Sequence, residues 1–214
     1  DKENFLIDLN KGIKGKKIAI PHNFGTRVVD KEVFEIFNSN IKLFEKLGAN
    51  LEEIKFDFDL NDFEQPFHKC LMHTFSFCVN EQFYNVDPKK LMPHVKNTIE
   101  RGKKVMASDY AKALAQLSEY RFKMDNIFSK FDYIVSPTVA IPPHKCNERP
   151  NIINGKIDIS NIEDKEMFEE NDYDYSSWIF VLAQFTAPFN WSGNPAVSLP
   201  CGFTKSGLPI GLQL

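Results

Sequence analysis

The order of apolar runs in residues 17–56 restricts the fold more than any other feature of this sequence. Residues 17–20 have the length and composition of a short buried strand. Apolar side chains then recur at helical spacing over residues 33–47, Gly48 marks the expected end of that helix, and residues 51–56 fit a second strand. Two strands joined by one helix are normally parallel neighbours with a right-handed crossover. The sequence therefore predicts an α/β fold whose sheet is mixed, largely parallel and covered by helices.

The middle of the chain carries helical patterns followed by one more strand. Residues 62–83 favour a buried helix because aromatic and aliphatic side chains are frequent there, and residues 91–101 fit a shorter helix ended by Gly102. Asp30 is placed to cap the first helix and Ser108 to cap the third. Residues 132–136 then return to a strand pattern. The apolar face predicted for the third helix consists of Tyr110, Leu114, Leu117, Met124 and Phe128.

Charge and cysteine content argue against several classes of protein. The net charge of −3 and the pI near 6.0 provide no basic surface for phosphates, so no direct nucleic-acid partner is expected. No apolar run approaches the roughly 18 residues of a membrane helix, and no secretory signal is visible. The four cysteines form no CxxC pair, which favours reduced thiols and a cytoplasmic location.

No cluster of residues points to a cofactor or a metal. The sequence contains neither G-x-G-x-x-G nor a P-loop, so a nucleotide site is not expected. His68, Cys70, His73 and Cys78 lack the spacing of a zinc site, and we interpret them as ordinary core or surface residues. Residues 163–174 hold seven carboxylates against one lysine, and we interpret them as an acidic surface excursion rather than a metal site.

The last forty residues contain the most specific pattern. They comprise FTAPFNWSGNPAVSLPCGF over residues 185–203 and GLPIGLQ over residues 207–213. Apolar runs and turn residues predict a strand at 196–199, a break at 200–202, a turn at 206–207 and a last strand. This segment resembles the C-terminal part of the amidase signature family, which has the form F-x-x-P-x-N-x-x-G-x-P-A-x-S-x-P-x-G followed by G-L-P-x-G-x-Q. Every fixed position of that form is met.

Two further segments support the resemblance. GKKIAIP at residues 15–21, with the helix that ends in Leu-Gly-Ala at 47–49, is similar to the strand and helix that follow the family's catalytic core. FDYIVSPT at residues 131–138 is similar to its later D-x-x-x-x-P-T strand. The resemblance thus covers nearly the whole chain. It implies the family's α/β/α fold and, for the intact protein, hydrolysis of a carboxylic amide to an acid and ammonia or an amine through an acyl-serine intermediate.

The catalytic groups of that family are not found in this sequence. The resemblance implies a nucleophilic Ser, a bridging Ser and a Lys base, with the serines in or near a Gly/Ser-rich motif upstream of the segments matched here. No such motif occurs; Ser176-Ser177 is the only adjacent serine pair, and the S-x-x-K match from Ser39 to Lys42 lies on an ordinary amphipathic helix. Nothing in the sequence suggests an activating His beside Cys201, which we interpret as a small buried residue at a strand end. We therefore expect no catalytic residue here. Residues 1–214 are interpreted as a single domain, the C-terminal part of a longer amidase-like protein, inactive alone.

The resemblance also implies binding partners. It predicts a small amide substrate in the intact enzyme, no cofactor, and the missing N-terminal catalytic half as the protein partner; it leaves homo-oligomers open and gives no reason to expect a membrane. Phe185, Phe189 and Trp191 are the candidates for the wall of the acyl pocket, with a role as core side chains as the alternative. Two other hypotheses are kept: the A-type subunit of the tRNA-dependent glutamyl/aspartyl amidotransferase, and a non-catalytic α/β binding module.

Overall fold

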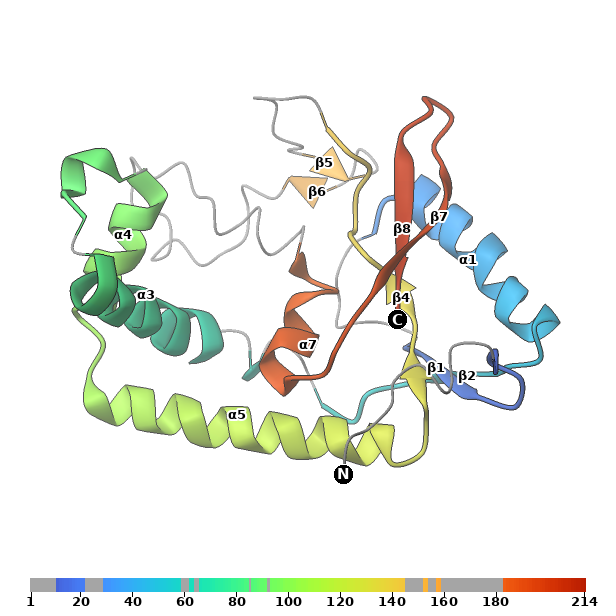
Figure 1. The fold of residues 1–214 in the computed structure, drawn as a ribbon, viewed down its shortest axis with the longest axis horizontal. Coiled ribbons are helices and arrows are strands. Elements are labelled where there is room, and N and C mark those ends of the chain that lie inside the picture. Colours follow the sequence, from blue (N-terminus) through green and yellow to red (C-terminus); the bar gives the residue numbers. More distant parts are fainter. Residues whose placement is uncertain are drawn as a thin grey trace.

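A parallel sheet forms the N-terminal part of the fold in the computed structural model (Figure 1). The structure describes residues 11–21, 29–58, 62–63, 66–84, 86–91, 93–144, 152–153, 157–158 and 183–214. β1 (Lys17–Pro21) lies between β2 (Asn50–Ile54) and β3 (Tyr133–Ile134), and both neighbours run parallel to it. The helix α1 (Lys31–Lys46) connects β1 to β2. The predicted strand–helix–strand unit is therefore confirmed, together with the mixed α/β class.

Local chemistry sets both ends of α1. The Asp30 carboxylate accepts hydrogen bonds from two backbone N–H groups of the first turn, at 2.8 and 3.4 Å, so the predicted cap is confirmed. Beyond the last turn Gly48 has φ of +88°, a left-handed conformation that glycine adopts without steric cost. Val33, Phe37 and Ile41 are buried. These three side chains lie on one face of α1 because they are spaced four residues apart.

A second, antiparallel sheet lies at the C-terminal end of the chain. β8 (Pro209–Gln213) is antiparallel to β4 (Ser136–Pro137) on one side and to β7 (Ser198–Phe203) on the other. The predicted break at residues 200–202 is a shift of register within β7, and the strand continues through it. Gly207, with φ of +83°, lies in the turn between β7 and β8.

The strand predicted over residues 132–136 is divided between the two sheets. β3 pairs with β1, whereas β4 pairs with β8. Val135, between the two short strands, donates its backbone N–H to the carbonyl oxygen of Ala19 at 2.9 Å. One continuous segment therefore joins the parallel sheet to the antiparallel one.

A helical segment is present over most of the predicted residues 62–83, but it is buried only in part: Phe63 and Leu71 are buried, whereas residues 73–79 are not. The π-helical η1 (Pro66–Met72), α3 (His73–Val79) and the π-helical η2 (Asn80–Tyr84) follow one another. No side chain of α3 is buried, and the Phe75 ring is 64% exposed. The reason is its position: α3 packs against α4, and the two helices project away from the sheets (Figure 1).

Close approach of these two helices depends on a glycine. α4 (Pro93–Gly102), which follows the short turn η3 (Pro88–Lys90), ends at Gly102 as predicted. A Cβ atom on Gly102 would overlap the carbonyl oxygen of His73 and lie 2.7 Å from Cβ of Phe77. Any side chain there would push α4 away from α3.

The long helix α5 (Ala107–Phe128) differs in detail from the sequence prediction. Met106 occupies the N-cap position without a side-chain hydrogen bond, so the predicted Ser108 cap is wrong. The predicted face is also partly wrong, since Leu114 is 43% exposed. The buried residues of α5 are Ala113, Tyr120 and Met124.

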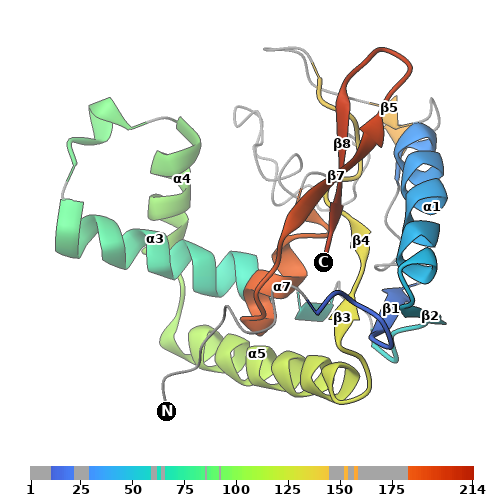
Figure 2. The same cartoon turned by 45° about the vertical axis from the view of Figure 1, so that its right-hand side comes forward.

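Helices cover both faces of the sheets. Neighbouring residues of β1 point to opposite sides, because Ile18 belongs to a core cluster with α1 and Ala19 to a second cluster with α5. The second cluster also contains side chains of α7 (Ala187–Ser192). Figure 2 shows α1 on one side of the strands and α5 with α7 on the other. The chain thus forms three layers, α/β/α, as the sequence predicted.

Two further short strands form a separate sheet. β5 (Ile152–Ile153) and β6 (Ile157–Asp158) pair antiparallel. The acidic stretch at residues 163–174 lies outside the described residues, so its surface position stays a prediction. In the part of the chain that the structure describes, no helix combines the length and the hydropathy needed to cross a bilayer.

Candidate functional site

The three aromatic side chains predicted as a pocket wall lie on or just before α7. Phe185 and Phe189 are each 4% exposed, and Trp191 is 1% exposed. All three belong to one core cluster with Tyr120 of α5. The Tyr120 ring meets the Trp191 indole edge-on, with 5.7 Å between ring centroids. The structure therefore brings the three together among this chain's own side chains, and a role in a substrate pocket stays a prediction.

Side chains from α5 and β8 hold the backbone around α7. Three carbonyl oxygens there accept a side-chain hydrogen bond, and two of these bonds are buried. A buried carbonyl that loses its partner costs about 1–3 kcal/mol, so the contacts fix α7 against its neighbours. The pairs are Tyr120 Oη to Pro188 O at 3.0 Å, Arg121 Nε to Trp191 O at 3.1 Å and Gln213 Nε2 to Phe185 O at 2.9 Å.

Two hydroxyl groups meet over the central strand of the antiparallel sheet. Thr138 Oγ1 and Ser198 Oγ lie 2.7 Å apart, and both lie close to Gly211 of β8. Thr138 follows β4 directly and Ser198 begins β7, so the pair bridges the strands on either side of β8. This pair was not among the residues predicted from the sequence. One signal could have found it, because all three residues occupy fixed positions of the family patterns.

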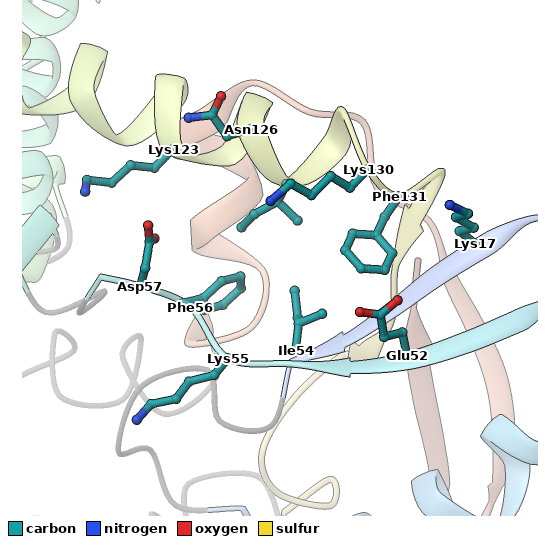
Figure 3. A pocket seen from close by; sticks show the side chains of 11 residues that line it. Lys17, Glu52, Ile54, Lys55, Phe56, Asp57, Lys123, Asn126, Lys130 and Phe131 are labelled. Atoms are coloured by element: carbon teal, nitrogen blue, oxygen red, sulfur yellow. The ribbon is translucent and has the colours of Figure 1, made fainter.

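A pocket of about 520 Å³ lies elsewhere, between β2 and the last turns of α5 (Figure 3). Ile54, Phe56 and Phe131 form an apolar floor, and Lys130 extends over it. The volume suits a small molecule. The lining contains no hydroxyl, thiol or imidazole group and none of the three predicted wall residues. This pocket therefore supplies no serine, threonine or cysteine nucleophile for acyl transfer.

The other candidates weighed from the sequence are placed as follows. The Ser39 hydroxyl donates to the backbone carbonyls one turn earlier, at 2.9 and 3.0 Å, and Lys42 is exposed, so the S-x-x-K match is no catalytic pair. Burial raises the pKa of the Cys201 thiol, which disfavours the nucleophilic thiolate. Ser176-Ser177 lies outside the described residues.

The residues considered for zinc do not assemble where the structure describes them. Cys70 and His73 are partly buried and Cys78 is exposed, whereas the His68 side chain lies outside the described part. Over the described ranges, no three His, Cys, Asp or Glu side chains gather closely enough to hold a metal ion. The described residues therefore suggest no metal centre.

The sequence is similar to a known protein family and to curated proteins. The family model described as Amidase matches residues 2–214. Among curated proteins, the A-type subunit of glutamyl-tRNA(Gln) amidotransferase from Alkaliphilus metalliredigens (strain QYMF) is 27% identical over 237 residues, which covers 99% of this chain and 43% of that protein. The chain thus spans less than half the length of this curated relative.

Solved structures show the same fold. A bacterial aryl acylamidase of the amidase signature family superposes with a TM-score of 0.72 at 22% identity, over 100% of this chain and 42% of that one. The A-type subunit of glutamyl-tRNA(Gln) amidotransferase from Thermotoga maritima superposes with a TM-score of 0.62 at 22% identity, over 100% of this chain and 41% of that one. At such identities the similarity concerns the fold alone.

Proposed function

The chain belongs to the amidase signature family, and on this basis we propose that the intact protein hydrolyses a carboxylic amide to the acid and ammonia or an amine. The observation that carries the proposal is the family match over residues 2–214. The α/β/α layers agree with it, because an aryl acylamidase of the family has the same fold. The match favours this function over a non-catalytic binding module.

Residues 1–214 supply the C-terminal part of the enzyme in this proposal, and an N-terminal half supplies the catalytic groups. Two facts support this division: the chain spans 43% of the curated relative, and its sequence has no Gly/Ser-rich motif. This division predicts that residues 1–214 alone are inactive. As a cytoplasmic protein it would keep its four cysteines reduced.

The chemistry requires an uncharged lysine beside two serines. The lysine accepts the proton of the bridging serine, which in turn accepts the proton of the nucleophilic serine as that oxygen attacks the amide carbonyl. Backbone N–H groups stabilise the tetrahedral oxyanion. The C–N bond then breaks, the amine leaves with a proton, and water hydrolyses the acyl-serine to the acid. No cofactor enters these steps.

In this proposal the described residues form and hold one wall of the acyl pocket. The hydrogen bonds from α5 and β8 hold α7, and the proposed acyl pocket lies against Phe185, Phe189 and Trp191. Their rings provide an apolar surface, which suits the acyl part of a small amide. Because these rings are almost fully buried within the described chain, substitutions there should change folding stability as well as substrate preference.

Activity of the chain alone and of the intact protein tests the proposal. Each is incubated with acetamide, benzamide or glutamine, and released ammonia is measured. We expect none above the buffer rate from residues 1–214 and turnover from the intact protein. Turnover by residues 1–214 that a single Ser or Cys substitution abolishes would show that the active site is misplaced here. The gene region upstream provides an independent check, since it should encode a Gly/Ser-rich segment and an earlier lysine.

One observation favours a second candidate, the amidase subunit of a tRNA-dependent amidotransferase. The curated relative described above is named as the A-type subunit of such an enzyme. In that case the intact protein works within a heteromeric complex on charged tRNA. Co-purification with two further subunits supports this candidate. An intact single-chain enzyme that releases ammonia from simple amides counts against it.

A further inference from the structure

Three neighbouring strands, β4, β8 and β7, position the hydroxyl pair of Thr138 and Ser198. The Thr138 backbone N–H donates to the carbonyl oxygen of Gly211 at 2.9 Å, which extends the β4–β8 pairing by one residue. Ser198 lies across β8 from it, opposite Gln213. Their hydroxyls reach toward each other diagonally over β8 and meet at 2.7 Å. This geometry is a product of the strand register.

Gly211 makes the space for the pair. A Cβ atom there would lie 2.8 Å from Thr138 Oγ1 and 2.9 Å from Ser198 Oγ, closer than real Cβ atoms approach. Gly211 is not among the glycines with positive φ, so its backbone conformation does not demand glycine. The glycine is needed because two oxygen atoms occupy the place of a side chain.

The pair has hydrogen-bonding capacity left over. Two hydroxyls carry two hydrogens and several lone pairs, and their mutual bond uses one hydrogen. Within the described residues, no other side-chain hydrogen bond involves either hydroxyl. The contact is exposed, and Ser198 is an exposed residue. One donor and acceptor lone pairs are therefore available to an outside group.

The position of the pair connects it to the proposed acyl pocket. Gln213 lies two residues beyond Gly211 on β8, so the two residues face the same side of the sheet. The Gln213 side chain is the one that holds the carbonyl oxygen of Phe185, next to α7. The exposed hydroxyls thus lie on the same face of the sheet as the Gln213 side chain, which contacts the backbone of one candidate wall residue.

We propose that Thr138 and Ser198 together bind an uncharged amide group of the substrate. One hydroxyl donates to the amide oxygen and the other accepts from the amide N–H, which matches the donor and the acceptor that an amide offers. A neutral pair is suited to a neutral polar group, because it provides no charge to offset a carboxylate or an ammonium. The inference rests on the proposed function and names substrate-binding residues for it.

Steady-state kinetics of the intact protein test the inference. Thr138→Val and Ser198→Ala each remove one hydroxyl, and Thr138→Ser keeps it. With the best substrate among acetamide, benzamide and glutamine, we expect KM to rise about 3- to 10-fold in the first two variants, as for the loss of one neutral hydrogen bond. We expect kcat within about 2-fold of the unsubstituted enzyme, and Thr138→Ser to keep its KM.

A second hydroxyl pair in the same hairpin provides the matched control. Thr204 Oγ1 and Ser206 Oγ lie 2.9 Å apart in the β7–β8 turn, where Thr204 Oγ1 also accepts the Leu208 backbone N–H at 2.9 Å. Ser206→Ala removes a comparable hydroxyl from that turn. KM should be unchanged in this variant.

The outcomes separate this inference from the proposed function. If the intact protein turns over an amide and Thr138→Val and Ser198→Ala leave KM unchanged while lowering Tm, the pair is structural and the inference is overturned. A fall in kcat alone also overturns it. If the unsubstituted intact protein neither turns over nor binds any of the three amides, the proposed function fails and the inference fails with it.

Discussion

A single carboxylate, Asp132, ties the start of β1 to the segment that leads into β3. Asp132 Oδ1 lies 2.8 Å from Lys16 Nζ, and Oδ2 accepts the Lys17 backbone N–H at 2.8 Å. The Lys16 side chain, and then the Lys17 N–H, lower the pKa of Asp132 below its ordinary value of 3.8. A carboxylate with a lower pKa in the folded state stabilises the fold above its unfolded pKa and loses this effect as pH falls through the folded value.

We expect Asp132→Asn to lower the free energy of unfolding at pH 7 and to have less effect at low pH. The loss at pH 7 should be about 0.5–1 kcal/mol, because the ion pair is partly exposed and screened by salt. Urea unfolding of both proteins from pH 7 to pH 2.5 measures it. The difference should narrow below pH 3.8, the ordinary value of the Asp132 pKa.

A control variant separates the Asp132 contacts from the general effect of losing a charge. Asp109 lies 3.9 Å from Lys112 on the exposed side of α5, and Asp109→Asn removes the same charge from a looser pair. This variant should cost less stability at pH 7. A difference between wild type and Asp132→Asn that stays constant down to pH 2.5 would contradict the assignment.

Among the elements, β8 is the central strand of the antiparallel sheet, and Gly211 is the position on it where an added side chain would have least room. We expect Gly211→Ala to destabilise the protein by about 1–3 kcal/mol, because the new methyl group overlaps two hydroxyl oxygens in a packed sheet. Urea unfolding measures the loss. The same substitution made together with Thr138→Ala and Ser198→Ala should cost much less, since the overlapping oxygens are gone. An equal cost in both backgrounds would mean that the strain lies in the backbone.

Elements with local signals could be predicted from the sequence, and those set by distant partners could not. The cap at Asp30 and the glycine at Gly48 mark the ends of α1 within a few residues of sequence, so that helix is as expected. The division of residues 132–136 depends on partners at Ala19 and Gln213, which no local pattern identifies. The buried face of α5 likewise depends on what packs against it.

The candidate site could likewise be predicted only in part from the sequence. The sequence indicated Phe185, Phe189 and Trp191 by aromatic character, but that character suits a core as well as a pocket wall, and the structure buries all three. The two hydroxyls of Thr138 and Ser198 are 60 residues apart in sequence. The family patterns mark both residues, but that the two hydroxyls meet follows only from the pairing of both flanking strands with β8, which no local pattern specifies.

At the scale of the whole molecule, one edge of the antiparallel sheet is open in the described structure. β7 has β8 on one side, and no strand is paired with its other side within the described residues. Its apolar side chains are exposed: Leu199 is 41% exposed and Phe203 is 69% exposed. An apolar edge strand attracts other strands unless a bulge, a proline or a covering segment protects it. In β7 the register shift and Pro200 interrupt the middle of the strand, and the exposed Leu199 and Phe203 lie on either side of that interruption. The proposed N-terminal half, if it packs here, would cover this edge.

The isolated chain should therefore self-associate through β7. At tens of micromolar, sedimentation velocity should show dimers or larger species of residues 1–214, and Phe203→Lys should shift the population toward monomer, because a charge on an edge strand opposes strand pairing. Phe122→Lys is the matched control, since Phe122 is 65% exposed but lies on α5, away from the sheet edge. An equal effect of both substitutions would indicate general hydrophobic association, and a monomeric unsubstituted chain would show that the edge of β7 is already protected.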